Sequence, residues 1–262
     1  HYGHAMKALG LGYDLLLEKP VSPNIAECLE IEKYAREHNR KVLVCHVLRY
    51  ANYYRKIKEL LDSGVLGDVK LIKHDEHISW WHFCHSYVRG NWRREEDTSP
   101  MLLAKCCHDM DLPYWFAGSK CKSLSSYGSL SFFNADNAPE GAADSCFDCK
   151  YKDECIYECT YQYVGRGCKK NKFPWGTYAF SVSPKKADVI DALKKGERGR
   201  LWSRCVFKCD NDVVDCQTVN MEMENGVRIV MTANAFNEKD HRLTEIRGTK
   251  GELIADDTGS VI

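Results

Sequence analysis

The sequence predicts an α/β segment over residues 1–49, the tail of a doubly wound parallel sheet, followed by an α+β domain with a mainly antiparallel open sheet over residues 50–262. Helix and strand candidates alternate through the first segment, which is the rhythm of a doubly wound sheet. Beyond Arg49, long strand candidates follow one another with few helices between them, and Asn225-Gly226 is a strong hairpin signal. No internal repeat or low-complexity linker interrupts this order.

The first segment begins with a short helix over residues 4–11, which Gly12 ends. The apolar runs at residues 15–17 and 41–45 predict two short strands that are covered on both faces, as in a parallel sheet. Between them, Ser22 and Pro23 are typical of a helix N-cap and a first helical position. The helix that follows is expected to bury the apolar residues at helical spacing, namely Ile25, Cys28, Leu29 and Ala35.

The second part opens with an amphipathic helix over residues 52–63, whose inward side chains are expected to be Tyr54, Ile57, Leu60 and Leu61. Strands are expected at 69–78, 123–133, 201–207, 212–224 and 226–235. A polar, cysteine-rich insertion near residues 134–172 interrupts them, and it contains few apolar residues that could form a core of its own. Residues 248–254 form a turn that leads into a strand without a partner, so we expect an exposed sheet edge there and truncation at both ends of the chain.

Composition excludes several classes of protein. The 37 Lys and Arg residues balance 37 Asp and Glu residues, and a formal net charge of zero argues against a nucleic-acid binder. No run approaches the ~18 apolar residues of a membrane span, and the first residues lack the pattern of a signal peptide. Since 44% of the 262 residues are hydrophobic, a core can form without disulfide bonds.

The sequence contains 14 cysteines, a high number. In a chain of this size, adjacent or isolated cysteines such as Cys106 and Cys107 are more typical of reduced, buried thiols than of disulfides. We therefore expect a reducing compartment, the cytoplasm.

The tripeptide Glu18-Lys19-Pro20 follows the first predicted strand. In open α/β sheets, ligands bind in the crevice outside the carboxyl ends of the strands. A lysine at that place faces a partly desolvated cleft, where it can shuttle a proton. The alternative is a solvated loop lysine, and the Lys19-Pro20 peptide bond is a candidate for the cis form.

A second polar group lies in the segment from Lys105 to Asp111. On one continuous helix, Lys105, His108 and Asp111 share a face, because they are spaced three residues apart. Asp111 could then orient the imidazole of His108, which could accept or donate a proton near neutral pH. The alternative is an exposed polar stripe, although the apolar neighbours of these residues argue against full exposure.

Histidine and aromatic residues gather between residues 74 and 93. Alternation along a strand separates His74 from His77, so a metal site is not favoured there. The group that follows the strand, with Trp92 and Arg93, suits a sugar pocket, in which aromatic faces pack on C–H surfaces and polar groups bind hydroxyls; a plain aromatic core is the alternative. Arg49, at the junction of the two parts, could reach the same cleft or close a salt bridge.

The insertion carries cysteines at the spacing of a metal site: Cys146-x2-Cys149-x5-Cys155, followed by Cys159 and Cys168. Structural zinc takes four tetrahedral thiolate or imidazole ligands, and Cys-x2-Cys is a frequent pair among them. We expect zinc on Cys146, Cys149 and Cys155, with Cys168 or Cys159 in the fourth place. Iron–sulfur ligation, reduced thiols and disulfides are the alternatives.

Three segments, in this order, resemble the Gfo/Idh/MocA oxidoreductases, the glucose–fructose oxidoreductase and inositol dehydrogenase family. Residues 3–31 (GHAMKALGLGYDLLLEKPVSPNIAECLEI) are similar to the segment around the family's Glu-Lys-Pro motif. Residues 46–69 (HVLRYANYYRKIKELLDSGVLGDV) resemble the segment where its chain leaves the Rossmann domain. Residues 99–112 (SPMLLAKCCHDMDL) resemble its substrate-site helix. The similarity covers residues 1–120 and continues weakly to the end.

The resemblance implies hydride transfer between a hydroxyl-bearing carbon of a sugar or cyclitol and the nicotinamide of NAD or NADP. Glu18, Lys19 and Pro20 would lie at the cofactor, and Lys19 would contact the reacting hydroxyl. His108 would bind or deprotonate that hydroxyl, with Arg49, Trp92, Arg93 and Asp111 as further substrate contacts. Ala104 departs from the family, which usually has an aspartate there, so Lys105 beside it is a candidate for part of the polar role.

Two alternatives stay open within this resemblance. One is a glycosidase that uses a transient oxidation on a bound nicotinamide, and the other is a non-catalytic sugar-binding or regulatory protein that keeps the fold. No G-x-G-x-x-G occurs in the chain, so the phosphate-binding loop is expected upstream, and the chain alone should bind nucleotide poorly and be inactive. We also expect a homo-oligomer that pairs through the open sheet.

Overall fold

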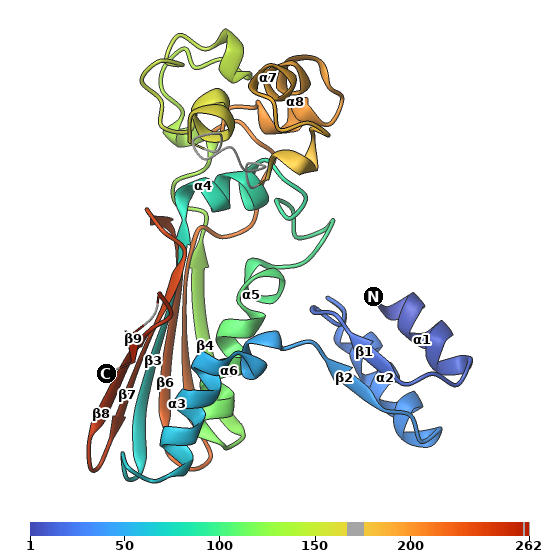
Figure 1. Ribbon diagram of the computed structural model, residues 1–262, viewed down its shortest axis with the longest axis vertical. Coiled ribbons are helices and arrows are strands. Elements are labelled where there is room, and N and C mark those ends of the chain that lie inside the picture. The colour runs from blue at the N-terminus through green and yellow to red at the C-terminus, as the bar shows by residue number, and fades with distance from the viewer. Residues whose placement is uncertain (167–175, 259, 262) are drawn as a thin grey trace.

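The computed structural model describes residues 1–166, 176–258 and 260–261, which form two β-sheets with helices packed against them (Figure 1). The α-helices are α1 Tyr2–Gly10, α2 Ile25–Glu37, α3 Asn52–Asp62, α4 Trp80–Phe83, α5 Met101–Ala104, α6 Cys107–Ala117, α7 Lys186–Lys195 and α8 Gly199–Trp202. The strands are β1 Leu15–Leu17, β2 Val42–Val44, β3 Val69–Ser79, β4 Cys121–Ser129, β5 Cys216–Met223, β6 Arg228–Asn237, β7 His241–Gly248, β8 Glu252–Asp256 and β9 Ser260–Val261. Short 3₁₀ turns lie at Val47–Tyr50, Ala135–Asn137, Cys146–Asp148 and Thr177–Ala179, and π-helical turns at Cys84–Val88 and Tyr161–Arg166.

The first sheet contains β1 and β2, which run parallel with Leu16 opposite Leu43. Helices α1 and α2 accompany it, and the small core between them is formed by Ala5, Leu9, Leu17 and Ile31. The order helix, strand, helix, strand confirms the predicted α/β segment.

Two details of this segment were predicted wrongly. The N-cap of α2 is Asn24, whose side chain accepts a hydrogen bond from the Ala26 N–H, and not Ser22. Ile25 is 77% exposed and Leu16 is 72% exposed, although both were expected to be buried. The reason is that two helices and two strands form one small core, and no described residue covers the remaining apolar side chains.

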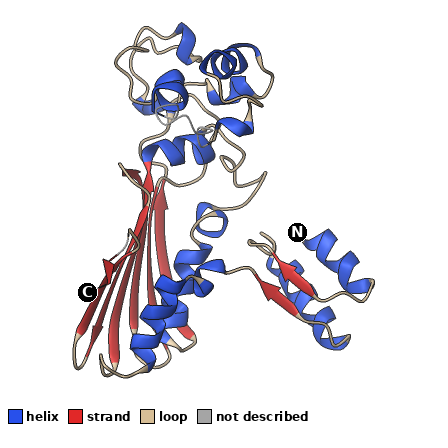
Figure 2. Ribbon diagram, in the orientation of Figure 1, coloured by secondary structure: helices blue, strands red, loops and turns tan. Residues whose placement is uncertain are grey.

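The second sheet has seven strands in the order β4-β5-β6-β3-β7-β8-β9. Every neighbouring pair is antiparallel except β3 and β6, which are parallel. The prediction of a mainly antiparallel open sheet is therefore confirmed. Helices α3 and α6 lie along one face of this sheet, and no helix of the described residues lies on the other face (Figure 2).

Strand alternation determines which side chains face the helices. On β3, the side chains of Ile72, His74, Glu76 and Ile78 are buried, and the residues between them are half-buried on the other face. As predicted, Tyr54 and Ile57 of α3 are buried against this sheet. A strand with one covered and one open face is what an open antiparallel sheet requires.

The prediction of a strand over residues 201–207 is wrong. These residues end α8 and then form a turn, in which Val206 and Phe207 join the main core. A short apolar run does not by itself distinguish a strand from a buried turn or helix end. The predicted unpaired strand is also wrong, because β8 pairs with β7 and β9.

Beyond one end of the large sheet, next to α4, the insertion and helices α7 and α8 form a cap (Figure 1). The cap contains a second core of buried residues, namely Cys146, Cys159, Tyr163, Val189, Leu193 and Trp202. The expectation that the insertion has little to bury is therefore wrong, because α7 and α8 supply the missing half of its core. None of the helices in the described part of the chain has both the length and the apolar character needed to span a bilayer.

Candidate active site

Lys19 forms a hydrogen bond between the segment that contains the small sheet and helix α5. It follows β1, the peptide bond between Lys19 and Pro20 is cis, and its Nζ donates a 2.9 Å hydrogen bond to the carbonyl oxygen of Ala104. The carboxyl end of β1 is thus held against α5, where parallel sheets place their ligands.

A cleft of about 770 Å³ opens beside this contact. Lys19, Pro20, Ala104 and Lys105 lie in its wall, so the Glu-Lys-Pro segment and the start of the 105–111 segment meet at this cleft. The rest of the wall is rich in rings: His82, His85, Tyr87, Trp92, Tyr178 and Trp202, with Arg198 from the cap. Such a wall combines apolar faces with polar atoms, as sugars require.

The predicted single helical stripe of Lys105, His108 and Asp111 does not form. The helix breaks between α5 and α6, and Lys105 lies in the break. Its Nζ is 2.7 Å from Oε1 of Glu76 on β3, and this ion pair directs the side chain away from the face that His108 occupies.

Behind Lys105 lies a buried network of charged groups. Arg242 of β7 has its Nε 2.9 Å from Glu76 Oε2 and 2.6 Å from Asp109 Oδ1. His74 lies 3.1 Å from the same Asp109 oxygen through Nε2, and its Nδ1 is 2.9 Å from Thr244 Oγ1. Burial of both carboxylates is possible because cations neutralise them.

The two carboxylates of this network respond differently to burial. Burial and the charge of Asp109 raise the pKa of Glu76 to about 7, although Lys105 and Arg242 oppose the shift. Burial also disfavours the charge of Asp109, but Arg242 and His74 overcome it and hold the pKa of Asp109 well below its ordinary value. Asp109 is therefore the fixed negative charge of the network.

His108 lies on α6, half-buried, with its ring edge-to-face against His46 at a centroid distance of 5.8 Å. Its Nδ1 is buried and has no hydrogen-bond partner among the described residues. Burial, with the nearby Lys19 ammonium, lowers the pKa of His108 to about 4. His108 is close enough to Lys19 to feel its charge, but it is not among the residues of the cleft wall.

Asp111 does not orient His108. It forms two 2.7 Å hydrogen bonds with Nε and Nη2 of Arg49, and the Arg49 guanidinium also lies over the ring of Trp115. Two roles were considered for Arg49, a contact in the cleft and a salt bridge. In the structure Arg49 forms the salt bridge, with Asp111. Neither residue lies in the cleft wall, so their assignment to substrate contact lacks geometric support.

Trp92 and Arg93, the other two predicted substrate residues, do not lie in the same place. Trp92 lies in the cleft wall, whereas Arg93 is held by Asp210 through bonds of 2.8 Å and 3.0 Å and does not line the cleft. His74 faces the helices and His77 the open side of the sheet, as predicted. The described residues contain no metal-binding group made of these histidines.

The cysteine ligands predicted in the insertion lie together in the cap. Cys146, Cys149 and Cys155 line a cavity of about 30 Å³, and Cys205, which was not predicted, lines it too. Cys168 lies outside the described residues. None of the described cysteines is in a disulfide.

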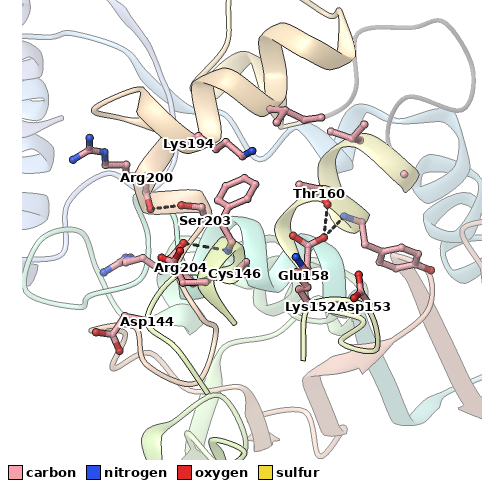
Figure 3. Close-up of a pocket in the computed structure, with 17 residues that line it drawn as sticks. Asp144, Cys146, Lys152, Asp153, Glu158, Thr160, Lys194, Arg200, Ser203 and Arg204 are labelled. Atoms are coloured by element: carbon pink, nitrogen blue, oxygen red, sulfur yellow. Dashed lines mark hydrogen bonds between the residues drawn. The ribbon is translucent and has the colours of Figure 1, made fainter. Parts of the chain in front are cut away.

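A larger cavity of about 1220 Å³ lies in the same cap (Figure 3). Its charged residues are of both signs, with Lys152, Lys194, Arg200 and Arg204 beside Asp144, Asp153 and Glu158. Neither Lys19 nor His108 lies in its wall, so it is separate from the candidate active site.

Glu76, Asp109 and Arg242 were not predicted as members of the site. Their signal in the sequence is weak but physical: alternation along β3 puts Glu76 on the same face as Ile72 and Ile78. A carboxylate on the covered face of a strand needs a buried cation. The identity of that cation depends on β7, which the sequence did not predict.

Two family models match the chain. The model for the NAD-binding Rossmann fold of the Gfo/Idh/MocA oxidoreductase family matches residues 1–46. The model for the C-terminal alpha/beta domain of the same family matches residues 58–261.

Individual relatives agree with these models. YteT of Bacillus subtilis, whose name describes it as a putative oxidoreductase, is 24% identical over an alignment of 264 positions that covers 97% of this chain and 57% of YteT. Inositol 2-dehydrogenase of Gluconacetobacter diazotrophicus is 28% identical over 116 residues, which are 44% of this chain and 31% of that enzyme. The chain therefore covers little more than half of YteT and about a third of the inositol dehydrogenase.

Solved structures share the fold. The crystal structure of scyllo-inositol dehydrogenase from Lactobacillus casei with bound NAD(H) and scyllo-inositol superposes with a TM-score of 0.58 at 18% identity, covering 97% of this chain and 53% of that one. At this identity the likeness concerns the fold alone. Because the C-terminal model matches more than half of the chain, in the order and with the two sheets just described, the chain belongs to the Gfo/Idh/MocA oxidoreductase family.

Proposed function

We propose that this chain is part of an NAD(P)-dependent oxidoreductase that transfers a hydride between a hydroxyl-bearing carbon of a sugar or cyclitol and nicotinamide. The observation that carries the proposal is the position of Lys19 at the carboxyl end of β1, in the wall of a cleft lined by aromatic rings. The inositol dehydrogenases among the relatives support this class of substrate.

Lys19 is proposed to hold the reacting hydroxyl. Among the described residues its one hydrogen bond goes to the Ala104 carbonyl, which leaves ammonium N–H groups able to donate to a substrate oxygen. Ala104 stands where the family usually has an aspartate, so here a backbone carbonyl, and not a carboxylate, orients the lysine. The side chain of Lys105 does not replace that aspartate, because Glu76 holds it.

His108 is proposed to take the hydroxyl proton as the substrate is oxidised. With a pKa of about 4, its imidazole is neutral at neutral pH and can accept a proton. His108 is not among the residues of the cleft wall, although it is near enough to Lys19 to be affected by the lysine's charge. The buried, unpartnered Nδ1 is the feature that favours a polar ligand at this place.

The nicotinamide is proposed to bind at the carboxyl ends of β1 and β2. Lys19 follows β1, His46 follows β2, and Nδ1 of His46 is buried without a hydrogen bond, its nearest carboxylate oxygen lying 3.8 Å away on Asp111. Unpartnered polar atoms at this edge fit a polar ligand, so Glu18, Lys19 and Pro20 are the residues that would border the nicotinamide. When bound, that ring supplies the hydride acceptor.

The rings of the cleft are proposed to bind the substrate. Trp92 and Tyr87 offer flat apolar faces, and His82 and His85 add ring nitrogens. Stacking and hydrogen bonding together would orient the ring of the sugar so that one hydroxyl reaches Lys19.

The test is Lys19→Met in the full-length protein. We expect kcat with a cyclitol or sugar substrate to fall ~10²-fold or more, the range of a lost proton-transfer group. Nucleotide binding, measured by fluorescence titration, should stay unchanged, because phosphates are held elsewhere. Lys33→Met on the exposed side of α2 is the matched control and should keep full activity.

Unchanged turnover in Lys19→Met would refute the proposal. Glycoside cleavage without net production of NADH would favour the glycosidase alternative. Sugar binding with no turnover of any substrate in a panel of cyclitols and sugars would favour the non-catalytic alternative.

A further inference from the structure

We propose that Cys146, Cys149, Cys155 and Cys205 bind one zinc ion in a structural site of the cap. The four thiols line a single cavity of about 30 Å³, which is the volume of one small ion or water molecule and far too small for an organic ligand. Four thiolates around one small cavity are a ligand set that structural zinc takes. Among the described residues no three of these four sulfur atoms lie within 4.8 Å of one another, so the bound ion would draw them closer together.

The backbone brings the two outermost ligands to one face. An antiparallel bridge pairs Ser145 with Arg204. On either side of it, the Cys146 N–H donates to Ser203 O and the Cys205 N–H donates to Asp144 O, both at 2.8 Å. In an antiparallel pair, the residues next to a bridged pair all point to the face opposite it, so Cys146 and Cys205 point to the same side.

The other two ligands follow Cys146 through tight turns. A 3₁₀ turn at Cys146–Asp148 ends with the Cys149 N–H donating to Cys146 O at 3.3 Å. The next turn brings back Cys155, whose N–H donates to Tyr151 O at 2.9 Å. A Cys-x2-Cys turn followed by a third and a distant fourth cysteine is the arrangement of a zinc knuckle.

The buried side chain of Arg89 supplies a second, independent observation. It is fully buried and donates to Arg204 O, Gln162 Oε1, Tyr157 O and, at 3.4 Å, Cys146 Sγ. Among the residues that the structure describes, no carboxylate lies within salt-bridge distance of its guanidinium. A buried cation requires a buried anion. A zinc ion with four thiolates carries a net charge of −2, and it would place that anion beside Arg89.

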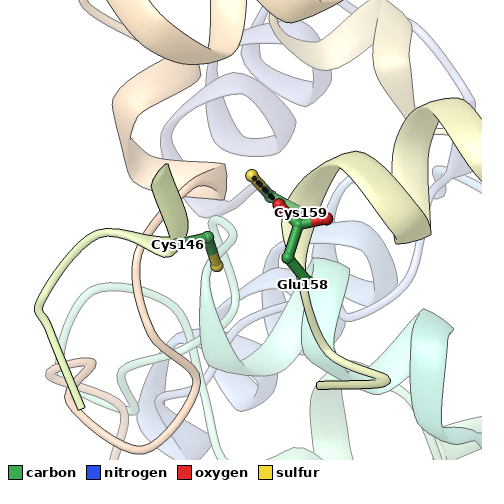
Figure 4. Close-up of side chains that lie close together, drawn as sticks. All are labelled: Cys146, Glu158 and Cys159. Carbon is green, nitrogen blue, oxygen red and sulfur yellow. Dashed lines mark hydrogen bonds between the residues drawn. The ribbon is translucent and has the colours of Figure 1, made fainter. Parts of the chain in front are cut away.

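A competing ligand set is Cys146, Glu158 and Cys159, whose ligand atoms lie within 4.8 Å of one another (Figure 4). Glu158 is already satisfied: its Oε2 accepts from Thr160 Oγ1 and the Tyr161 N–H, both at 2.6 Å, and its Oε1 accepts from Cys159 Sγ at 3.3 Å. Cys159 does not line the small cavity, whereas Cys146 does. Cys149, Cys155 and Cys205 form no hydrogen bond with Glu158 in the described part of the chain. We therefore assign the zinc ion to these three cysteines and Cys146.

The site would connect the cap to the cleft. Cys205 lies three residues beyond Trp202, whose Nε1 donates to His85 O at 3.1 Å and whose ring lines the cleft. A zinc ion on Cys205 would therefore fix one wall of the cleft from behind, and it would not contact Lys19.

The test is the metal content of the full-length protein purified without added metal. Elemental analysis should find one zinc per chain in the wild type. Cys149→Ser and Cys205→Ser should lose it, whereas Cys159→Ser and the matched control Cys28→Ser on α2 should keep it. Circular dichroism shows whether each variant still folds.

Because a variant that unfolds would also lose its metal, the wild type provides a second measurement. Removal of zinc with a chelator from the folded wild type should make four additional thiols reactive, and replacement with Co²⁺ should give the visible spectrum of tetrahedral thiolate ligation. A wild type without zinc, or one that contains iron and labile sulfide, would overturn the proposal. Retention of zinc by Cys205→Ser together with its loss from Cys159→Ser would overturn the ligand assignment.

Discussion

His108 is the residue whose protonation the structure controls most directly. Burial is the larger cause of its lowered pKa, and the charge of Lys19 is the next. A histidine whose pKa is lowered is neutral above that pKa, so the base form of His108 is present across the neutral range and is lost only as the pH approaches 4. The proposed role of His108 as proton acceptor therefore depends in part on the same lysine that is proposed to hold the substrate.

This dependence predicts an NMR titration of the full-length protein. The pKa of His108 should lie near 4 in the wild type and should move toward the ordinary 6.5 in Lys19→Met, because one nearby positive charge is removed. The move should be partial, since burial remains. Lys33→Met should leave the titration unchanged. A wild-type value near 6.5, or a value that Lys19→Met does not move, would contradict the electrostatic link between the two residues.

At the scale of secondary-structure elements, the charged network ties three of them together. Asp109 on α6 is bound by Arg242 on β7 and His74 on β3, so one carboxylate fixes the helix to the two central strands. Since the pKa of Asp109 lies below its ordinary value, the ion pairs of Asp109 stabilise the fold above the ordinary pKa of an aspartate. That stability is lost as the pH falls toward the pKa of the folded state.

We predict that Asp109→Ala lowers the free energy of unfolding by about 3–5 kcal/mol, because it leaves Arg242 buried without one of its counter-ions. Asp62→Ala is the matched control at the exposed end of α3, where loss of the ion pair with Lys58 should cost less than ~1 kcal/mol. Urea denaturation of both variants gives the comparison. Equal effects of the two substitutions would show that the network does not hold α6 to the sheet.

The helices and strands also show which parts of the structure could be predicted from the sequence. The strand β3 and the helix α3 were predicted to within a residue or two, because their alternation and helical spacing are local properties. The break between α5 and α6 was not, since Lys105 leaves the helix to reach Glu76, 29 positions earlier in the chain. Cys205 was missed for the same reason, because its neighbours Cys146 and Cys149 are distant in sequence. The position of Lys19 after a strand was predictable because a motif in the correct order carries information that local periodicity does not, and its catalytic role stays a prediction.

At the scale of the whole molecule, the cleft is built from four parts of the chain. Lys19 comes from the α/β segment, four rings come from residues 82–92, Ala104 and Lys105 come from the α5 region, and Tyr178, Arg198 and Trp202 come from the cap. Substitutions in the cap should therefore affect substrate binding more than they affect the rate of the chemical step.

We predict that Trp202→Ala raises KM for the sugar or cyclitol more than it lowers kcat, in steady-state kinetics of the full-length protein. The exposed Tyr178, which also lines the cleft, is the matched position, and Tyr178→Ala should show the same direction with a smaller size. A fall in kcat at unchanged KM would place the effect of Trp202 in the chemical step.

No described helix or strand layer covers the open face of the large sheet. A row of paired positions crosses it from Tyr127 on β4 through Thr218, Thr232 and Asp75 to Leu243 on β7. Tyr127 is 74% exposed, and the face mixes apolar side chains with ion pairs such as Lys73–Glu245. This composition suits a polar interface between two copies of the chain.

We therefore predict that the full-length protein is a homo-oligomer that pairs through this face. Analytical ultracentrifugation should find at least a dimer, and Tyr127→Glu should shift the population toward the monomer, because paired copies would bring the new carboxylate into a partly desolvated interface. Tyr13→Glu, at a tyrosine of similar exposure in the turn before β1, should leave the oligomer unchanged. A wild type that is monomeric at all concentrations would refute the interface, and an oligomer that survives Tyr127→Glu but dissociates with Tyr13→Glu would move it to the small sheet.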